Sequence, residues 1–213
     1  MVDEAGAYTD GRQVAPAAAR NRQPILDVLK RVLPPTGTVL ELASGTGEHA
    51  VFLGPKLAPR MWQPTDIAPD ALVSINAWLA KTGSANVRPP FLLDAAATAW
   101  PMEKLLPTPP ITAVVAINMI HIAPWQACLG LIAGARRVLK PGGVLYLYGP
   151  YSVGGAHTAP SNATFDEVLK SQDPDWGVRD VDDVEAAASQ QGFRLNETVA
   201  MPANNLSLVF VRG

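Results

Sequence analysis

Cysteine is almost absent from this sequence, and positive charge is not in excess. Cys128 is the only cysteine in 213 residues, which excludes an intramolecular disulfide and a metal site built on several thiolates. We therefore expect a cytoplasmic protein and no metal site. The 17 lysines and arginines are balanced by 19 aspartates and glutamates, so the net charge of −2 provides no field that would hold nucleic acid.

Long apolar runs and a secretory signal pattern are also missing. The most apolar stretch, residues 111–123, is too short to span a bilayer and contains Asn118 and His121. Asp3 and Glu4 stand near the start, where a signal peptide would carry basic residues before an apolar run. We expect a soluble protein with no membrane partner, which folds alone or as a homodimer.

The composition is typical of one globular domain. Hydrophobic residues make up 48% of the chain, and its length lies within the range that a single core serves. We therefore expect one domain over residues 1–213, with an N-terminal arm over residues 1–23.

Helical and strand patterns alternate along the chain. Helical spacing of apolar residues covers residues 24–33, 48–57, 69–81 and 124–139. Short apolar strands are expected over residues 38–42, 61–65, 88–93, 111–117 and 144–148. This order predicts a Rossmann-like α/β fold, in which helices cover both faces of a mostly parallel sheet. Two last strands, residues 193–201 and 206–211, are separated by too few residues for a crossover and predict an antiparallel C-terminal hairpin, which makes seven strands.

Glycines stand where the first strand turns into a helix, in Val39-Leu-Glu-Leu-Ala-Ser-Gly-Thr-Gly-Glu-His49. Gly45 and Gly47 let the backbone approach a ligand closely, and amides at a helix start favour electron-rich groups. The loop also satisfies the dinucleotide pattern G-x-G-x-x-A, so an NAD(P)-dependent oxidoreductase is an alternative. Glu41 at the strand end favours a different ligand, because a carboxylate suits the ammonium group of an amino acid better than a pyrophosphate.

Two further acids follow the next strands. Asp66 lies 19 residues after Gly47, close to the spacing at which a carboxylate accepts hydrogen bonds from a ribose diol. Asp94 ends the third strand, where it can meet an adenine amino group while Ile67 packs on the ring. Each acid alone is more typical of a helix cap. Together, at the carboxyl ends of successive strands, they predict a nucleoside site.

With these residues, the chain resembles the class I S-adenosylmethionine-dependent methyltransferases, and more closely the uncharacterised methyltransferase-like family of domain-of-unknown-function 938. The matching stretches are Ala15-Pro-Ala-Ala-Ala-Arg-Asn21, Glu41-Leu-Ala-Ser-Gly-Thr-Gly47, Trp62-Gln-Pro-Thr-Asp66, Ile117-Asn-Met-Ile-His121, Tyr148-Gly-Pro-Tyr151, Ser161-Asn-Ala-Thr-Phe-Asp166, Asp173-Pro-Asp-Trp-Gly177 and Met201-Pro-Ala-Asn-Asn-Leu206. One departure is visible, because Ala43 stands where the superfamily pattern has its first glycine.

The resemblance implies S-adenosylmethionine as cofactor and S-adenosylhomocysteine as product. It assigns the methionine portion to the loop, the ribose to Asp66, the adenine to residues after the third strand, and the sulfonium to residues after the fourth. The implied cofactor-binding residues are Arg20, Asn21, Glu41, Ala43, Ser44, Gly45, Gly47, Asp66, Ile67, Asp94, Ala95, Asn118 and Met119. The family carries no known activity from which a reaction follows.

Histidine is the expected base if the methyl acceptor must lose a proton, because its pKa is ordinarily about 6.5. The candidates are His121, just past the fourth strand, and His157, after the fifth, although a histidine hydrogen-bonded for structure is the more common case. The long connection over residues 149–180 is predicted to be a lid over the acceptor, and the arm that carries Arg20 and Asn21 would close the other side. The acceptor pocket is expected to use Trp125, Tyr148, Tyr151, Asn162, Trp176 and Arg179.

The predicted function is S-adenosylmethionine-dependent methyl transfer to an O, N or S atom of a small molecule. Two alternatives stay open: a catalytically silent protein that binds the cofactor or serves as a scaffold, and the NAD(P)-dependent oxidoreductase.

Overall fold

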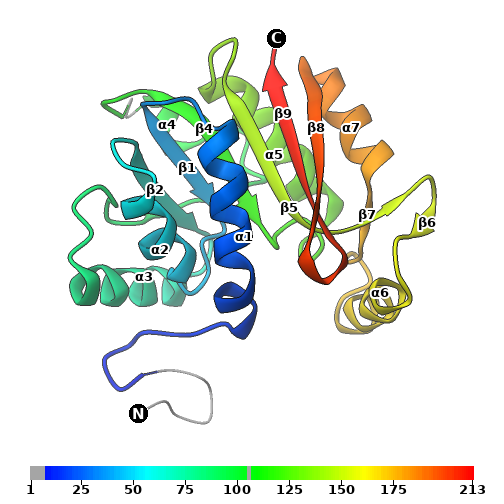
Figure 1. Ribbon diagram of the computed structural model, residues 1–213, viewed down its shortest axis with the longest axis horizontal. Helices are drawn as coiled ribbons and strands as arrows, with labels where there is room; N and C mark the ends of the chain where they lie inside the picture. The colour runs from blue at the N-terminus through cyan, green and yellow to red at the C-terminus, as the bar shows by residue number, and fades with distance from the viewer. Residues whose placement is uncertain (1–7, 105–106) are drawn as a thin grey trace.

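A twisted sheet forms the centre of the computed structural model, which describes residues 8–104 and 107–213 (Figure 1). The strands run in the order β3-β2-β1-β4-β5-β9-β8, and two short strands, β6 and β7, pair with β5. Their bounds are β1 (Thr38–Leu42), β2 (Met61–Asp66), β3 (Phe91–Leu92), β4 (Ile111–Ile117), β5 (Val144–Val153), β6 (Ala156–His157), β7 (Arg179–Asp180), β8 (Phe193–Met201) and β9 (Asn205–Arg212).

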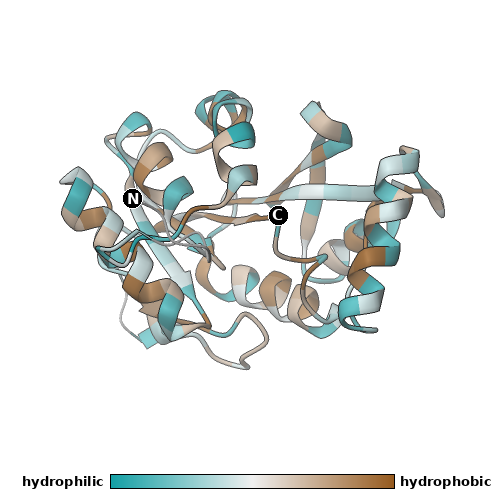
Figure 2. Cartoon of the chain, turned by 90° about the horizontal axis from the view of Figure 1, so that it is seen from below, coloured by the Kyte–Doolittle hydropathy of each residue, from teal (hydrophilic) through white to brown (hydrophobic). Residues whose placement is uncertain are grey.

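Helices lie on both sides of this sheet, and each carries both apolar and polar residues (Figure 2). Side chains of α1 and α2 pack with the apolar cluster on one face, whereas side chains of α5 and α7 pack with the cluster on the other. The helices are α1 (Pro16–Val32), α2 (Glu48–Lys56), α3 (Pro69–Thr82), α4 (Pro101–Lys104), α5 (Trp125–Val138), α6 (Pro160–Gln172) and α7 (Val181–Gln190), with a 3-10 turn η1 (Pro202–Asn204). In the described ranges 8–104 and 107–213, no helix combines the length and apolar composition that crossing a membrane requires.

The predicted topology is confirmed by the strand pairing. Strands β1 to β5 pair in parallel, while β9 pairs antiparallel with both β5 and β8. All five residues of β1 are buried, as expected for a central strand covered on both faces. The carboxyl ends of β1, β2, β3 and β4 consequently open toward the same edge, where sheets of this kind bind ligands.

The N-terminal arm is shorter than predicted, because α1 begins at Pro16 rather than at Pro24. Pro16 occupies the first turn, where its missing N–H costs no hydrogen bond, and alanines follow it. Pro24 lies inside the helix. Arg20 and Asn21 therefore belong to a helix and not to a loose arm, and residues 1–7 of the predicted arm lie outside the described residues.

The connection over residues 149–180 is also more ordered than a loop. Strand β5 continues to Val153, turns back through β6, and leads into the thirteen-residue helix α6 before β7. The amino end of α6 is tied to the β8–β9 turn, because the Asn162 amide donates to the carbonyl of Asn204 at 2.9 Å and Asn204 donates to the Ser161 hydroxyl at 3.1 Å. Figure 1 shows α6 beside that turn.

Candidate functional site

Glu41 is a buried carboxyl group at the carboxyl end of β1. Its side chain is 1% exposed, and Oε2 accepts hydrogen bonds from the Trp62 indole N–H and the Ser44 hydroxyl, both at 2.9 Å. Burial raises the pKa of Glu41 to about 7, although the two donors oppose the rise. A carboxyl group held in this state gains from a cation placed beside it.

The loop after Glu41 needs left-handed backbone at three positions. Gly45 and Gly47 have φ angles of 55° and 89°, and a Cβ on Gly47 would lie 2.9 Å from the Cα of Ile75 in α3. Ala43 takes a φ of 52°, which an L-residue with a Cβ adopts at a cost. The chain therefore keeps the loop geometry at the position where it lacks the pattern's first glycine.

Asp66 links the glycine loop to the end of β2. Its Oδ2 accepts from the amide of Gly45 at 2.8 Å, and its Oδ1 accepts from the amide of Ala68 at 2.9 Å. Asp66 is 6% exposed, so this carboxylate holds the loop and the start of α3 in place before any ligand contact. The predicted ribose residue is thus a structural residue of the loop as well.

A cavity of about 420 Å³ lies beyond the ends of β1, β2 and β3, and we call it the β3-side cavity. Two predicted adenine residues line it, the exposed acid Asp94 and the apolar Ile67. Its lining comprises Leu42, Ala43, Ile67, Leu93, Asp94, Ala95, Ala96, Met119, Ile122, Ala123, Pro124, Gln126, Ala127 and Trp176. Five predicted cofactor residues meet here. Trp176, predicted for the acceptor, also lies on this side.

A second cavity of about 610 Å³ lies over the end of β5, and we call it the β5-side cavity. The structure brings together in it the predicted residues from α1, the β4 end, β5 and α6. Its lining comprises Ala17, Arg20, Asn21, Asn118, His121, Ile122, Tyr148, Pro150, Ser161, Asn162, Phe165, Pro202, Ala203, Asn204 and Asn205. Both cavities fall in the size range of small-molecule sites.

The turn over residues 118–123 separates the two cavities, and its Ile122 lines both. The turn begins at Asn118, whose φ of 54° is left-handed, a conformation that asparagine tolerates. His121 lines the β5-side cavity, is 3% exposed, and its Nδ1 has no hydrogen-bond partner among the described residues. Burial, with help from the charge of Arg179, lowers the pKa of His121 to about 4. The imidazole is therefore neutral at physiological pH, and with a pKa of about 4 it is a weaker base than an exposed histidine.

Hydrogen bonds link His49 of α2 to Asn21 of α1, and Asn21 to Tyr148, which lines the same cavity. His49 Nε2 lies 2.7 Å from Oδ1 of Asn21, so His49 is the donor, because an amide oxygen only accepts. Burial raises the pKa of Tyr148, and its hydrogen bond to Asn21 opposes that rise. The amide of Asn21 is thereby oriented by its neighbours rather than free to rotate.

Several predicted residues lie elsewhere. Tyr151 is fully buried in the core beside α5 and α7, because β5 continues past Tyr148 and turns alternate side chains to opposite faces. His157 is exposed on β6, with Nε2 3.5 Å from Asp166. Trp125 and Arg179 line a shallow groove near α7. The structure thus brings His121, and not His157, to the site.

Sequence reasoning missed some cavity residues. Phe165 stacks edge-on against His121, with ring centroids 5.7 Å apart, and Gln126 lines the β3-side cavity. Phe165 reaches the site through the folding of α6, which no local pattern reveals. Gln126 lies on a helix that the sequence predicts, but no local pattern shows that its side chain lines a cavity. Asn204 and Asn205, at the turn between β8 and β9, also line the β5-side cavity.

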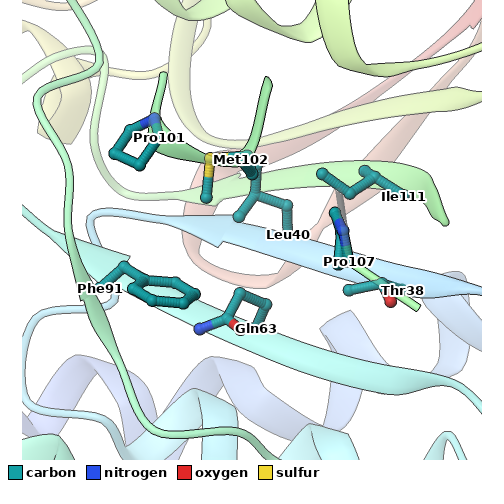
Figure 3. A pocket seen from close by; sticks show the side chains of 8 residues that line it. All are labelled: Thr38, Leu40, Gln63, Phe91, Pro101, Met102, Pro107 and Ile111. Carbon is teal, nitrogen blue, oxygen red and sulfur yellow. The ribbon is translucent and has the colours of Figure 1, made fainter. Parts of the chain in front are cut away.

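A third, much smaller cavity of about 20 Å³ lies on one face of the sheet (Figure 3). Thr38 and Ile111, the first residues of β1 and β4, help to line it, and Leu40, Met102 and Phe91 close it. This volume is about that of one water molecule. It lies toward the amino ends of β1 and β4, whereas the candidate site lies at the carboxyl ends of the strands.

Solved methyltransferase structures have the same fold. An O-methyltransferase family protein from Burkholderia thailandensis is 16% identical, with a TM-score of 0.75 over 92% of this chain and 57% of its own. An O-methyltransferase family 2 protein from Planctomyces limnophilus, in complex with apigenin, is 17% identical, with a TM-score of 0.77 over 92% and 58%. Human N-acetylserotonin methyltransferase, in complex with SAM, is 16% identical, with a TM-score of 0.74 over 92% and 53%.

These likenesses confirm the predicted Rossmann-like methyltransferase fold. The chain spans just over half the length of each of the three proteins. A family model described as "Protein of unknown function (DUF938)" matches residues 12–212, nearly the whole chain and all of the site described above. The chain therefore belongs to the DUF938 family of proteins of unknown function.

Proposed function

We propose that this protein is an S-adenosylmethionine-dependent methyltransferase that acts on a small molecule. One observation carries the proposal: a buried carboxyl group, Glu41, lies behind a glycine loop at the edge where two adjoining cavities open. The fold shared with methyltransferases, one of them in complex with SAM, supports the same reading.

The side chains fit such a cofactor. Glu41 is suited to the methionine ammonium group, Asp66 to the ribose, and Asp94 with Ile67 to the adenine in the β3-side cavity. We assign Asn118 and Met119, from the turn between the cavities, to the sulfonium region. When bound, the cofactor supplies an electrophilic methyl group on a sulfonium leaving group.

His121 is proposed as the base for acceptors that must lose a proton. An acceptor held in the β5-side cavity would lie where the cofactor would present its methyl group, and the neutral imidazole of His121 would take the proton that the acceptor loses. Positioning by the cavity walls supplies much of the rate, because methyl transfer needs an in-line approach. Tyr148 and Asn162 are proposed to orient the acceptor, and α6, which carries Phe165, is proposed to cover it.

Calorimetric titration tests the cofactor assignment. Purified protein is titrated with S-adenosylmethionine, S-adenosylhomocysteine and NAD(H), and mass spectrometry identifies any small molecule that copurifies. Saturable heat with the two adenosyl compounds, and none with NAD(H), is expected. Heat with NAD(H) alone would overturn the proposal in favour of the oxidoreductase.

Methyl transfer itself is tested with a cofactor labelled on its methyl group and a panel of small hydroxyl, amine and thiol acceptors. The variant His121→Gln is expected to lower turnover of a hydroxyl acceptor by about 10²-fold to 10⁴-fold while the heat of cofactor binding is retained. Cofactor binding without transfer to any acceptor would favour a catalytically silent binding protein. Cytoplasmic location and a homodimer remain predictions.

A further inference from the structure

Residues 173–180, which we call the strap, form hydrogen bonds with the turn over residues 118–123, which carries His121. The amide of Gly177 donates to the carbonyl of His121 at 3.0 Å. The guanidinium of Arg179 donates through Nε to the carbonyl of Ile120 at 3.0 Å and through one terminal nitrogen to the carbonyl of Ala123 at 2.6 Å. Three carbonyls of one six-residue turn therefore receive their hydrogen bonds from this strap.

The strap is itself fixed to the sheet. Arg179 and Asp180 form β7, which pairs with Tyr151 and Ser152 of β5. Asp180 Oδ2 accepts from the Ser152 hydroxyl and from the amide of Gly155, both at 2.8 Å, and Oδ1 caps α7 through the amide of Asp182 at 2.9 Å. The position of Arg179 is thus set by the extension of β5 and by the start of α7.

On its other side, the turn over residues 118–123 packs against β5. The amide of Asn118 donates to the carbonyl of Tyr148 at 2.8 Å. A Cβ on Gly149 would lie 3.0 Å from the His121 ring, so the imidazole packs directly against the β5 backbone. The strap also places Trp176 in the β3-side cavity, so one segment contacts both the wall of that cavity and the backbone of the other.

We infer that Arg179 is a positioning residue, which acts through the carbonyls of Ile120 and Ala123 to hold His121 in the β5-side cavity. The inference deepens the proposed function and rests on it for its catalytic meaning. Arg179 was predicted to bind the acceptor, but its guanidinium is already committed to carbonyls, including that of Asp175 at 2.8 Å. A planar group with several donors suits this bridging better than the single ammonium of lysine.

Arg179 also acts on His121 through its positive charge. Asp166 and Asp175 are the carboxylates around it whose charges act on it, the Cys128 thiol is uncharged because burial raises its pKa to about 12, and burial lowers the pKa of Arg179 itself. Its positive charge disfavours a proton on His121, so the same side chain that fixes the ring adds to burial, which is the larger cause of the lowered pKa of His121. Removing the guanidinium should loosen the turn and let the imidazole take up a proton more readily.

The test is titration of the histidine ring nitrogens by nitrogen-15 NMR in the protein without added ligand. The chain has three histidines, and His121→Gln identifies the His121 signals. In Arg179→Met, the pKa of His121 is expected to rise from about 4 toward its ordinary value of 6.5, and the ring signals are expected to shift. Arg179→Lys, which keeps a positive charge and loses the bridging geometry, is expected to shift the ring signals with a smaller change in pKa.

Arg60→Met is the matched control. Arg60 also donates to three backbone carbonyls, those of Pro34, Leu57 and Leu33, and these lie outside the cavity linings. Its loss should reduce stability without moving the His121 signals. A His121 titration in both Arg179 variants that matches wild type would overturn the inference. If Arg179→Met fails to fold, the ring shifts of Arg179→Lys decide alone.

This titration needs no cofactor and no acceptor, so its failure is distinct from failure of the proposed function. Titration calorimetry with S-adenosylhomocysteine on the same wild-type sample reports on the cofactor assignment. Heat from that compound together with an unmoved His121 would leave the methyltransferase proposal standing and remove the role of Arg179.

Discussion

The indole nitrogen of Trp62 lies 2.9 Å from Oε2 of Glu41, so a side chain of β2 donates to the carboxyl group at the end of β1. Trp62 is fully buried and packs with the apolar cluster beneath α1 and α2. The hydrogen bond favours the charged form of Glu41 in a place where burial disfavours it. Cofactor affinity in this protein is therefore expected to depend on pH through these two residues.

Affinity for S-adenosylmethionine is predicted to rise with pH through about 7, the pKa of the free Glu41 carboxyl. Below that pH the group is protonated and must lose its proton when the ammonium group binds, so binding releases a proton and weakens as pH falls. Calorimetry in buffers of different ionisation enthalpy measures the release. Glu41→Gln should bind more weakly at pH 8 by at least about tenfold, which corresponds to loss of one charge-assisted hydrogen bond. Its affinity should not change with pH in this range.

Stability of the ligand-free protein should show the opposite trend. Because the folded-state pKa of Glu41 lies above the value of 4.5 for an exposed group, its contribution is fully present below that value and is lost as pH rises through about 7. Glu41→Gln does not ionise, so its stability relative to wild type is expected to increase between pH 5 and pH 8. Urea unfolding at the two pH values measures this difference, and a constant difference would contradict the assignment.

Trp62→Phe is predicted to move the pH midpoint of cofactor binding upward. The change removes the donor to Glu41, and the charged carboxylate loses a stabilising contact. Trp100→Phe is the matched control, since Trp100 is equally buried and its indole nitrogen has no hydrogen-bond partner in the described part of the chain. Both variants lose ring volume, but only Trp62→Phe should shift the midpoint.

Asp66→Asn is predicted to weaken both folding and cofactor binding. An amide has one oxygen, so its NH₂ group would face an N–H that the Asp66 carboxylate now accepts, from Gly45 or Ala68. The expected loss of stability is about 1–3 kcal/mol. Asp70→Asn, an exposed change in the first turn of α3, serves as the control and should leave affinity unchanged. Equal cofactor affinity in the two variants would argue against a ribose role for Asp66.

Ala43→Gly is predicted to stabilise the protein by about 1 kcal/mol, because it relieves a left-handed residue that carries a Cβ. The thermal midpoint and urea unfolding measure the gain. Gly47→Ala makes the reverse change at a position where a Cβ would meet the Ile75 backbone, and it should destabilise. A loss of stability in Ala43→Gly would mean that the methyl contacts of Ala43 with the core outweigh the strain.

The central strands and the acids at their ends were predictable because their signals are local. Residues 111–117 are apolar apart from Thr112. Glu41 is the penultimate residue of β1, Asp66 is the last residue of β2, and Asp94 directly follows Phe91-Leu-Leu93. The folding of residues 149–180 was not predictable in the same way. Strands β6 and β7 contain two residues each and exist through pairing with β5, and α6 begins with polar residues typical of a loop.

The acceptor side of the site was predicted less well for a related reason. Tyr148 and Tyr151 look equivalent in the sequence, but they face opposite sides once β5 is known to run through both. Helix α1 was shortened in the prediction because Pro24 resembles a helix start. These errors come from tertiary contacts that decide where an element ends.

The hydrogen bonds between α6 and the β8–β9 turn bear on the order in which the site forms during translation. Residues 202–205 line the β5-side cavity and follow the glycine loop by more than 150 residues. A chain emerging from the ribosome can form the first strands and their loop long before the opposite wall has been synthesised. The half of the site proposed for the cofactor would thus be assembled first, and the half proposed for the acceptor would be completed only after residues 202–205 have been synthesised.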